Sequence, residues 1–309
     1  MKIWYQSYVD YEHGAEYWDE LRKHLDKIAD PGTQVDIKGI TPHDNYAHAI
    51  VEFRCAREVI CNAVRAEREG YDAFIIGHFQ DAGLYEARSV VDIPVLGMGE
   101  ASMLHSCQLG QRSGIVTINR RFIPWFHHQI GKYGLKERVT GVHAMDFEPG
   151  QILSAFGSDE RLEEVRALFE AQAKPLVEQG VDVLIPGGGI PMLLFSQLKD
   201  HRVDGAPVIN GIPIVVKMAE MAVRLRTDRT WHQPHLRLRQ AADRDYRGIH
   251  GPSEGALGNS RFTMIGGLAL LYAGPRQRGK RRHAFKPGQA LMNFTHSHAP
   301  TSCGFSDDW

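Results

Sequence analysis

The sequence predicts an α/β protein of two pseudo-symmetric lobes, each an open, mostly parallel sheet flanked by helices, with an irregular C-terminal extension. Three observations lead to this prediction. Short apolar runs alternate with longer helical patterns through residues 1–227 of the 309, and part of this region recurs about 110 residues later. The periodic pattern then stops, and residues 228–309 show scattered Gly and Pro instead.

Strand and helix patterns alternate through the first hundred residues. Two helices are expected, over 15–29 and 49–69, because apolar residues recur there on one face at helical spacing. The apolar runs around them have the length or the alternation of strands, and they cover residues 2–9, 34–40, 73–76 and 95–96.

The same alternation continues to residue 227. Strands are expected over 115–117, 139–143, 183–185 and 208–209. The clearest helix starts after Ser158, which suits an N-cap, carries Asp159 and Glu160 in its first turn, and stops at Gly180. Strands separated by helices of this length indicate βαβ units and a parallel sheet.

An internal repeat relates the two halves of this region. Residues 69–78 (EGYDAFIIGH) align without a gap with 179–188 (QGVDVLIPGG), and two further pairs of segments follow at nearly the same offset. A duplicated lobe places two similar sheets face to face, and ligands of such sheets bind beyond the carboxyl ends of the strands. The repeat therefore nominates four strand ends: Gln6 with Ser7, 77–80, 117–119 and 187–189.

The expected domain boundaries follow from the repeat and from charge. Lobe 1 comprises 1–98 plus 212–227, lobe 2 comprises 99–211, and the extension comprises 228–309. The formal net charge of -1 combines a basic extension, with twelve Lys and Arg against six Asp and Glu, and an acidic remainder. A chain with no global basic field is not expected to bind nucleic acid generally. The extension is interpreted as an appendage, a cap on the cleft or an oligomer interface, or an anion site at Arg281 and Arg282.

Other classes of protein are disfavoured by composition. The four cysteines form no CxxC pair, residues 1–14 lack the apolar core of a signal peptide, and the longest apolar stretch is too short to span a membrane. We therefore expect a cytoplasmic protein without a membrane partner. The histidines form no HExxH motif, and only His296 and His298 form an HxH, so neither a metal nor a cofactor is expected.

Five segments carry a resemblance to a known family. The most specific are IIGHFQDAGLYEAR (75–88), DIPVLGMGEAS (92–102) and GVDVLIPGGGIPM (180–192), joined by 113–126 and 206–225. Together they resemble the Asp/Glu/hydantoin racemase superfamily, and most closely its hydantoin racemase branch. The resemblance implies a substrate cleft between two lobes, a cofactor-independent isomerase of amino acid metabolism, and a homo-oligomer.

The sequence differs from this family at the positions of the family's catalytic residues. Typical members use two cysteines, one at the tip of each equivalent strand, because inversion needs an acid and a base on opposite faces of one carbon. The first position falls on His78 and the second on Gly188, whereas the cysteines present are Cys55, Cys61, Cys107 and Cys303. On this alignment the two-cysteine mechanism is therefore not expected to be available.

His78 is the candidate catalytic residue because imidazole can give or accept a proton near neutral pH. The structural alternative is a histidine whose nitrogens satisfy loop carbonyls. Gly187, Gly188 and Gly189 would bind a carboxylate or enolate oxygen through their N–H groups, or form a tight turn that needs positive φ. Further candidates for substrate binding are Gln6, Ser7, Phe79, Thr117 and Asn119. Asp81 would orient His78 or cap the following helix.

The function expected from the resemblance and these substitutions is proton transfer at or next to the acidic carbon of a small carboxylate or cyclic amide, such as a hydantoin. Decarboxylation or hydrolytic ring opening on the same scaffold, as a lyase or hydrolase, is the alternative activity. A catalytically inert homologue that binds a small molecule, or a regulator acting through the basic extension, belongs to a different class.

Overall fold

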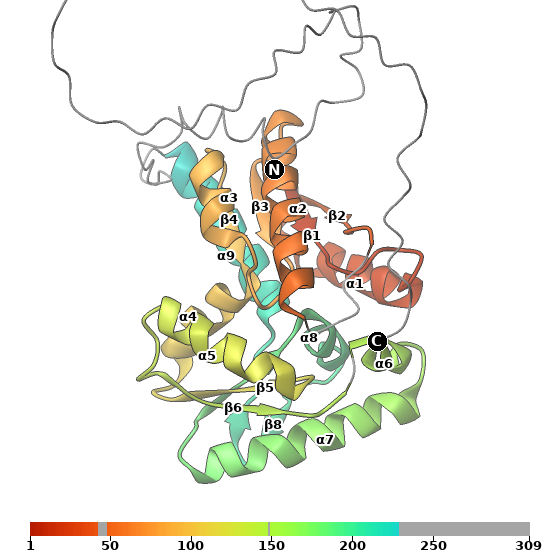
Figure 1. Ribbon diagram of the computed structural model, residues 1–309, viewed down its shortest axis with the longest axis vertical. Coiled ribbons are helices and arrows are strands. Elements are labelled where there is room, and N and C mark those ends of the chain that lie inside the picture. Colours follow the sequence, from red (N-terminus) through yellow and green to blue (C-terminus); the bar gives the residue numbers. More distant parts are fainter. Residues whose placement is uncertain (43–47, 148, 229–309) are drawn as a thin grey trace, which may run out of the picture. The chain divides into compact units, whose positions relative to one another are not determined.

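A computed structural model describes residues 1–42, 48–147 and 149–228 of the chain. The predicted extension, apart from Asp228, lies outside the described residues, as do Arg281, Arg282, the HxH pair and Cys303. Within the described part, seven strands divide between two parallel sheets, with β1 to β4 in one and β5 to β7 in the other (Figure 1). The predicted α/β class with parallel sheets flanked by helices is confirmed.

The first sheet has the strand order β2-β1-β3-β4, and all its pairings are parallel. Its strands are β1 (Lys2–Gln6), β2 (Gln34–Lys38), β3 (Ala73–Ile76) and β4 (Val95–Gly97). Tyr5 at the centre of the sheet pairs with Ile37 on one side and Ile75 on the other. The carboxyl ends of β1 and β3 therefore lie side by side.

The second sheet has the order β6-β5-β7 and is also parallel. Its strands are β5 (Ser113–Thr117), β6 (Val139–Ala144) and β7 (Val183–Gly187). An isolated parallel bridge joins Val208 to Leu184 of β7, in the place that β4 occupies beside β3. The second sheet thus repeats the order of the first, which confirms the predicted duplication.

The prediction of a strand over 208–209 is wrong, because the structure has only an isolated bridge there. The structure places an antiparallel pair just before it, β8 (Arg202–Val203) with β9 (Ala206–Pro207). The N–H of Val208 donates to His201 within this hairpin, at 2.9 Å, and only the N–H of Ile209 donates to β7. Competition from the local hairpin reduces the fourth strand of the second sheet to a single bridge.

The helices predicted over 15–29, over 49–69 and after Ser158 are present, and their ends agree with the prediction within two residues. Ser158 caps α7 as expected, because its side chain accepts from the N–H of Arg161. The helical segments are α1 (Ala15–Ile28), α2 (Ala49–Arg68), α3 (Leu84–Val90), α4 (Met98–Leu109), η1 (Arg120–Phe122), α5 (Ile123–Lys132), α6 (Pro149–Ile152), η2 (Leu153–Ala155), α7 (Asp159–Glu178), α8 (Gly189–Phe195) and α9 (Gly211–Thr227).

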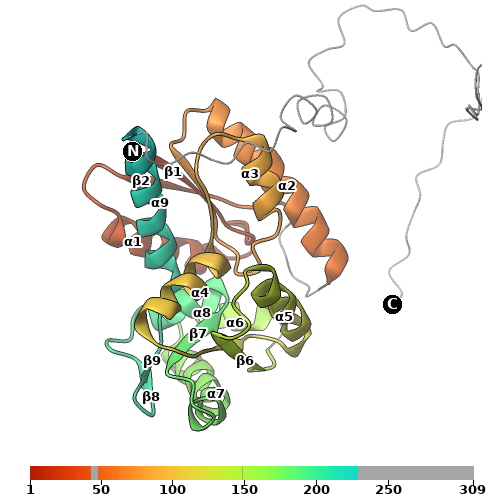
Figure 2. The same ribbon diagram turned by 90° about the vertical axis from the view of Figure 1, so that its left-hand side faces the viewer.

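Both faces of the first sheet are covered. Side chains of a strand alternate between faces, so Trp4 and Phe74 pack in one cluster with α2, while Tyr5 and Ile75 pack in the other cluster with α1 and α9. In Figure 2, α2 and α9 flank the first sheet. Because helices cover both faces of this sheet, its polar groups can reach a ligand only at the ends of the strands.

Helix α9 brings residues 211–227 back to the first sheet, since it contacts β3 and β4 as well as α4. The boundaries predicted for the two lobes stay a prediction. In the described part of the chain, no helix is both long and apolar enough to cross a membrane.

Phe74→Ala should destabilise the protein by about 3–5 kcal/mol, because the ring is 0% exposed in the central strand β3 and its removal leaves a cavity. Phe53→Ala is the matched control, since Phe53 of α2 is 69% exposed, and it should change stability by less than about 0.5 kcal/mol. Urea unfolding measures both, and equal effects would contradict this placement of the core.

Candidate functional site

A small cleft lies where the carboxyl ends of the two sheets meet. It has a volume of about 60 Å³, room for a few water-sized groups. Apart from Tyr17 of α1, its lining follows β1 (Tyr8, Val9), follows β3 (Gly77, His78, Gln80), follows β5 (Ile118, Phe122) or begins at the end of β7 (187–191). Segments about 110 residues apart in sequence thus share one cavity, as the repeat predicts.

His78 lies in this cleft, half-buried, two residues beyond β3. Its imidazole stacks on the ring of Tyr8, with centroids 4.0 Å apart and planes 7° apart, and the Tyr8 hydroxyl donates to the Ala82 carbonyl at 3.4 Å. Burial lowers the pKa of His78 to about 3, because an imidazolium would lose its hydration. The neutral imidazole, which can accept a proton, therefore predominates at neutral pH.

All three glycines after β7 line the cleft, but none needs positive φ. The turn alternative based on left-handed backbone is therefore wrong. Close approach explains two of them: a Cβ on Gly187 would lie 2.7 Å from a methyl of Ile115, and one on Gly189 would lie 3.1 Å from the Gly77 carbonyl oxygen. The loops after β3 and β7 thus touch through glycines.

Gly188 differs from its neighbours. A Cβ there would meet only the ring of Pro191, at 3.1–3.3 Å. Its N–H donates to the Pro186 carbonyl at 2.9 Å, so this donor is engaged within the turn. A small side chain would fit at Gly188 only if the ring of Pro191 moved by a few tenths of an ångström.

Two predicted binding residues after β1 do not line the cleft. The Gln6 amide accepts from Trp4 and Asn62 and donates to the carbonyls of Ser7 and Lys38. The Ser7 hydroxyl donates to the Val9 carbonyl at 3.0 Å. Both side chains hold the end of β1 in shape.

Three further predicted residues also lie outside the lining. The Phe79 ring is buried against Phe126, edge to face at 5.1 Å. Thr117 donates to the Gly187 carbonyl at 3.0 Å, which ties β5 to β7. The Asn119 side chain accepts from the N–H of Arg121 and donates to a carbonyl of the following loop. Their side chains position the cleft-forming turns.

Sequence reasoning missed several residues that do line the cleft. Tyr8 and Val9 follow the nominated Gln6 and Ser7 directly, so the correct strand end was identified but the wrong positions on it. Tyr17 lies on α1 beside Trp18, and helical periodicity indicates only that residues of this helix face are buried. No local motif could have identified it, because its place in the cleft depends on the packing of α1.

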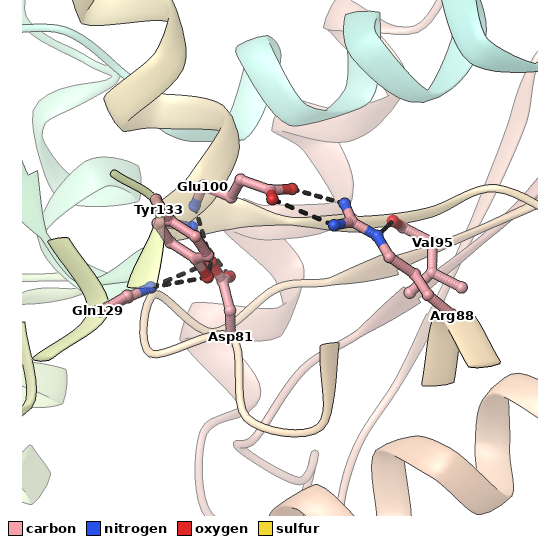
Figure 3. Close-up of polar contacts among 7 residues, drawn as sticks. Asp81, Arg88, Val95, Glu100, Gln129 and Tyr133 are labelled. Carbon is pink, nitrogen blue, oxygen red and sulfur yellow. Dashed lines mark hydrogen bonds and ion pairs between the residues drawn. The ribbon is translucent and has the colours of Figure 1, made fainter. Parts of the chain in front are cut away.

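Asp81 joins the loop after His78 to helices of the second half (Figure 3). Its buried carboxylate accepts from the N–H groups of Gly99 and Glu100, at 3.0 and 2.7 Å, from Tyr133 at 2.7 Å and from Gln129 at 3.0 Å. The side chain therefore caps α4, not the helix that follows it in sequence, and it does not orient His78 directly.

The same network holds the backbone of this loop. The Gln129 amide donates to the Phe79 carbonyl at 2.7 Å as well as to Asp81. Glu100 pairs with Arg88, whose guanidinium also donates to the Val95 carbonyl (Figure 3). Burial raises the pKa of Asp81 to about 7, although the hydrogen bonds from Tyr133, Gly99 and Glu100 act in the opposite direction.

The described residues offer neither a cysteine in the cleft lining nor a group of three or more His, Cys, Asp or Glu placed to hold a metal ion. Cys55 and Cys61 lie on α2 and Cys107 lies on α4.

The raised pKa of Asp81 predicts a pH dependence of stability. A solvated aspartate titrates near 3.8, so protonation of Asp81 favours the folded state, and this contribution is lost as pH rises through about 7. The unfolding free energy should fall between about pH 4 and 7, and Asp81→Asn, which cannot titrate, should lack that part of the fall. Urea unfolding across this range measures it, and equal slopes in both proteins would contradict it.

Comparison with known proteins places this geometry in a family. The chain is 29% identical to a hydantoin racemase of Rhizobium meliloti over 50% of this chain and 62% of that protein. It is 31% identical to a hydantoin racemase of Pseudomonas sp. strain NS671 over 54% of this chain and 64% of that protein. The matches thus span less than two thirds of the length of these relatives.

A solved structure shows the same fold. Allantoin racemase from Klebsiella pneumoniae superposes with a TM-score of 0.60 at 23% identity, over 73% of this chain and 89% of that chain. The family model described as Asp/Glu/Hydantoin racemase matches residues 14–219. That match covers more than half of the sequence, and the chain belongs to the Asp/Glu/hydantoin racemase family.

Proposed function

We propose that this chain is a racemase-family enzyme that moves a proton at or next to the acidic carbon of a small carboxylate or cyclic amide, without a two-cysteine mechanism. One observation carries the proposal. The two positions that correspond to the family cysteines, His78 and Gly188, are far apart in sequence and line the same cleft. This arrangement supports a racemase-like site in which side chains other than cysteine act.

His78 is suited to remove the proton. Its neutral imidazole has a basic ring nitrogen at neutral pH, and the stacked Tyr8 ring fixes its plane. A negative charge that develops on an adjacent substrate would favour the imidazolium and raise the pKa of His78 during the reaction. The low pKa of the buried imidazole is therefore compatible with a base that acts only when a substrate ionises.

The lining favours a cyclic amide over an acidic amino acid. Among the described residues, those that line the cleft carry no formal charge at neutral pH, and most are apolar or aromatic. A dicarboxylate would leave its charges unpaired in such a site, whereas a hydantoin with an apolar substituent buries a neutral ring. Racemisation of such a ring is the proposed reaction, and ring opening or decarboxylation is the alternative outcome of the test.

His78→Ala should abolish racemisation, with a loss of roughly 100-fold or more, because the proton acceptor is removed. The measurement follows the optical rotation of single enantiomers of 5-isopropylhydantoin, with the uncatalysed rate subtracted. His127→Ala is the control, since this exposed histidine of α5 lies outside the cleft lining.

Unchanged racemisation in His78→Ala would contradict the assignment of His78. Native protein that binds the hydantoin in a thermal-shift assay but shows neither racemisation nor product would favour the inert homologue. Homo-oligomeric assembly stays a prediction.

A further inference from the structure

The second proton-transfer group of the proposed reaction can be sought among the polar side chains that line the cleft. Within the described residues these are Tyr8, Tyr17, His78 and Gln80. A glutamine does not titrate, and the Tyr8 hydroxyl donates to a backbone carbonyl while its ring stacks on His78. Tyr17 remains as the group that can exchange a proton with a substrate.

Tyr17 is held firmly at this position. It lies in the first turn of α1 and is 3% exposed, and its ring packs edge to face against Phe156, with centroids 5.6 Å apart. Phe156 follows η2, beyond β6, so Tyr17 contacts elements from both halves of the fold. The Ser7 hydroxyl interacts with the phenol, and burial raises the pKa of Tyr17 to about 12, which keeps it protonated.

A second phenol lies behind the first. Tyr5 is 0% exposed, and its hydroxyl has no hydrogen-bond partner among the residues that the structure describes. Its ring edge contacts Gly77 of the cleft lining, and it lies close enough to Tyr17 for the charge of one phenolate to oppose ionisation of the other. A buried donor without an acceptor is costly unless an acceptor forms during function.

We propose that Tyr17 is the second proton-transfer residue of this cleft, opposite in role to His78, and that Tyr5 stabilises its phenolate. This inference rests on the proposed function. His78 takes the proton from the C–H bond, and the electron pair moves onto the adjacent carbonyl oxygen as an enolate. Tyr17 then gives its O–H proton to the other face of the carbon.

This sequence conserves atoms and charge. The products are the inverted ring, a Tyr17 phenolate and a His78 imidazolium, and transfer of the imidazolium proton to the phenolate through water restores both groups. The reverse direction begins with transfer of the Tyr17 proton to His78 through water, after which the Tyr17 phenolate acts as the base and the His78 imidazolium acts as the acid. Each enantiomer therefore exposes its C–H bond to a different residue.

The test follows deuterium incorporation into each enantiomer of 5-isopropylhydantoin in heavy water, by proton NMR with chiral separation. Tyr17→Phe should lose racemisation by roughly 100-fold but still exchange the enantiomer whose C–H bond faces His78. His78→Ala, which lacks the acceptor for the Tyr17 proton, should exchange neither enantiomer. Tyr5→Phe should lower the racemisation rate by roughly 10-fold with little change in KM. Tyr11→Phe, a change at a tyrosine that is 54% exposed, should behave as the native protein.

The outcomes separate the two proposals. Racemisation in Tyr17→Phe at the native rate, or exchange of both enantiomers in a Tyr17→Phe variant whose circular dichroism is native, would overturn the role of Tyr17 while leaving that of His78. Loss of exchange from both enantiomers in that variant would overturn the separate roles of the two residues. Absence of exchange in the native protein would overturn the proposed function and this inference with it. If Tyr17→Phe does not fold, a native rate in Tyr5→Phe overturns the phenol pair.

Discussion

Burial of both faces of a parallel sheet is the constraint on which this structure depends. Trp4 and Phe74 face one layer of helices while Tyr5 and Ile75 face another, so the central strands β1 and β3 are buried almost throughout. Polar function is confined to the turns beyond the strands, and because the second sheet has the same order, the turns of both halves meet. The cleft contains His78 and Gly188 for this reason, and glycines at 77 and 189 allow the two turns to touch.

The fold could be predicted from the sequence because the two patterns that indicate it, apolar periodicity and an internal repeat, can be recognised without knowledge of distant contacts. Apolar alternation and helical spacing depend on neighbouring residues, and the 110-residue repeat identifies equivalent strand ends without any knowledge of packing. The fourth strand of the second half was the exception, since the hairpin of β8 and β9 competes for the same backbone.

The site could be predicted only to the level of the strand end. Gln6, Thr117 and Asn119 have the right side-chain chemistry and lie at the right ends, but their hydrogen bonds hold the turns, and the adjacent Tyr8 and Ile118 reach the cleft instead. Asp81 accepts from Gly99 of α4 and from Gln129 of α5, which lie 18 and 48 residues further along the chain. Which side chain faces a cavity is decided by the packing of distant elements, and neither composition nor periodicity reports that packing.

We propose that this cleft performs proton transfer without a thiol. A variant with Cys55, Cys61, Cys107 and Cys303 all replaced by alanine tests that claim most directly, by the rate of hydantoin racemisation in a protein whose circular dichroism is native. We expect a rate within about twofold of the native rate, because the described cysteines lie on α2 and α4 and not in the cleft lining. Loss of racemisation in the folded cysteine-free variant would contradict it.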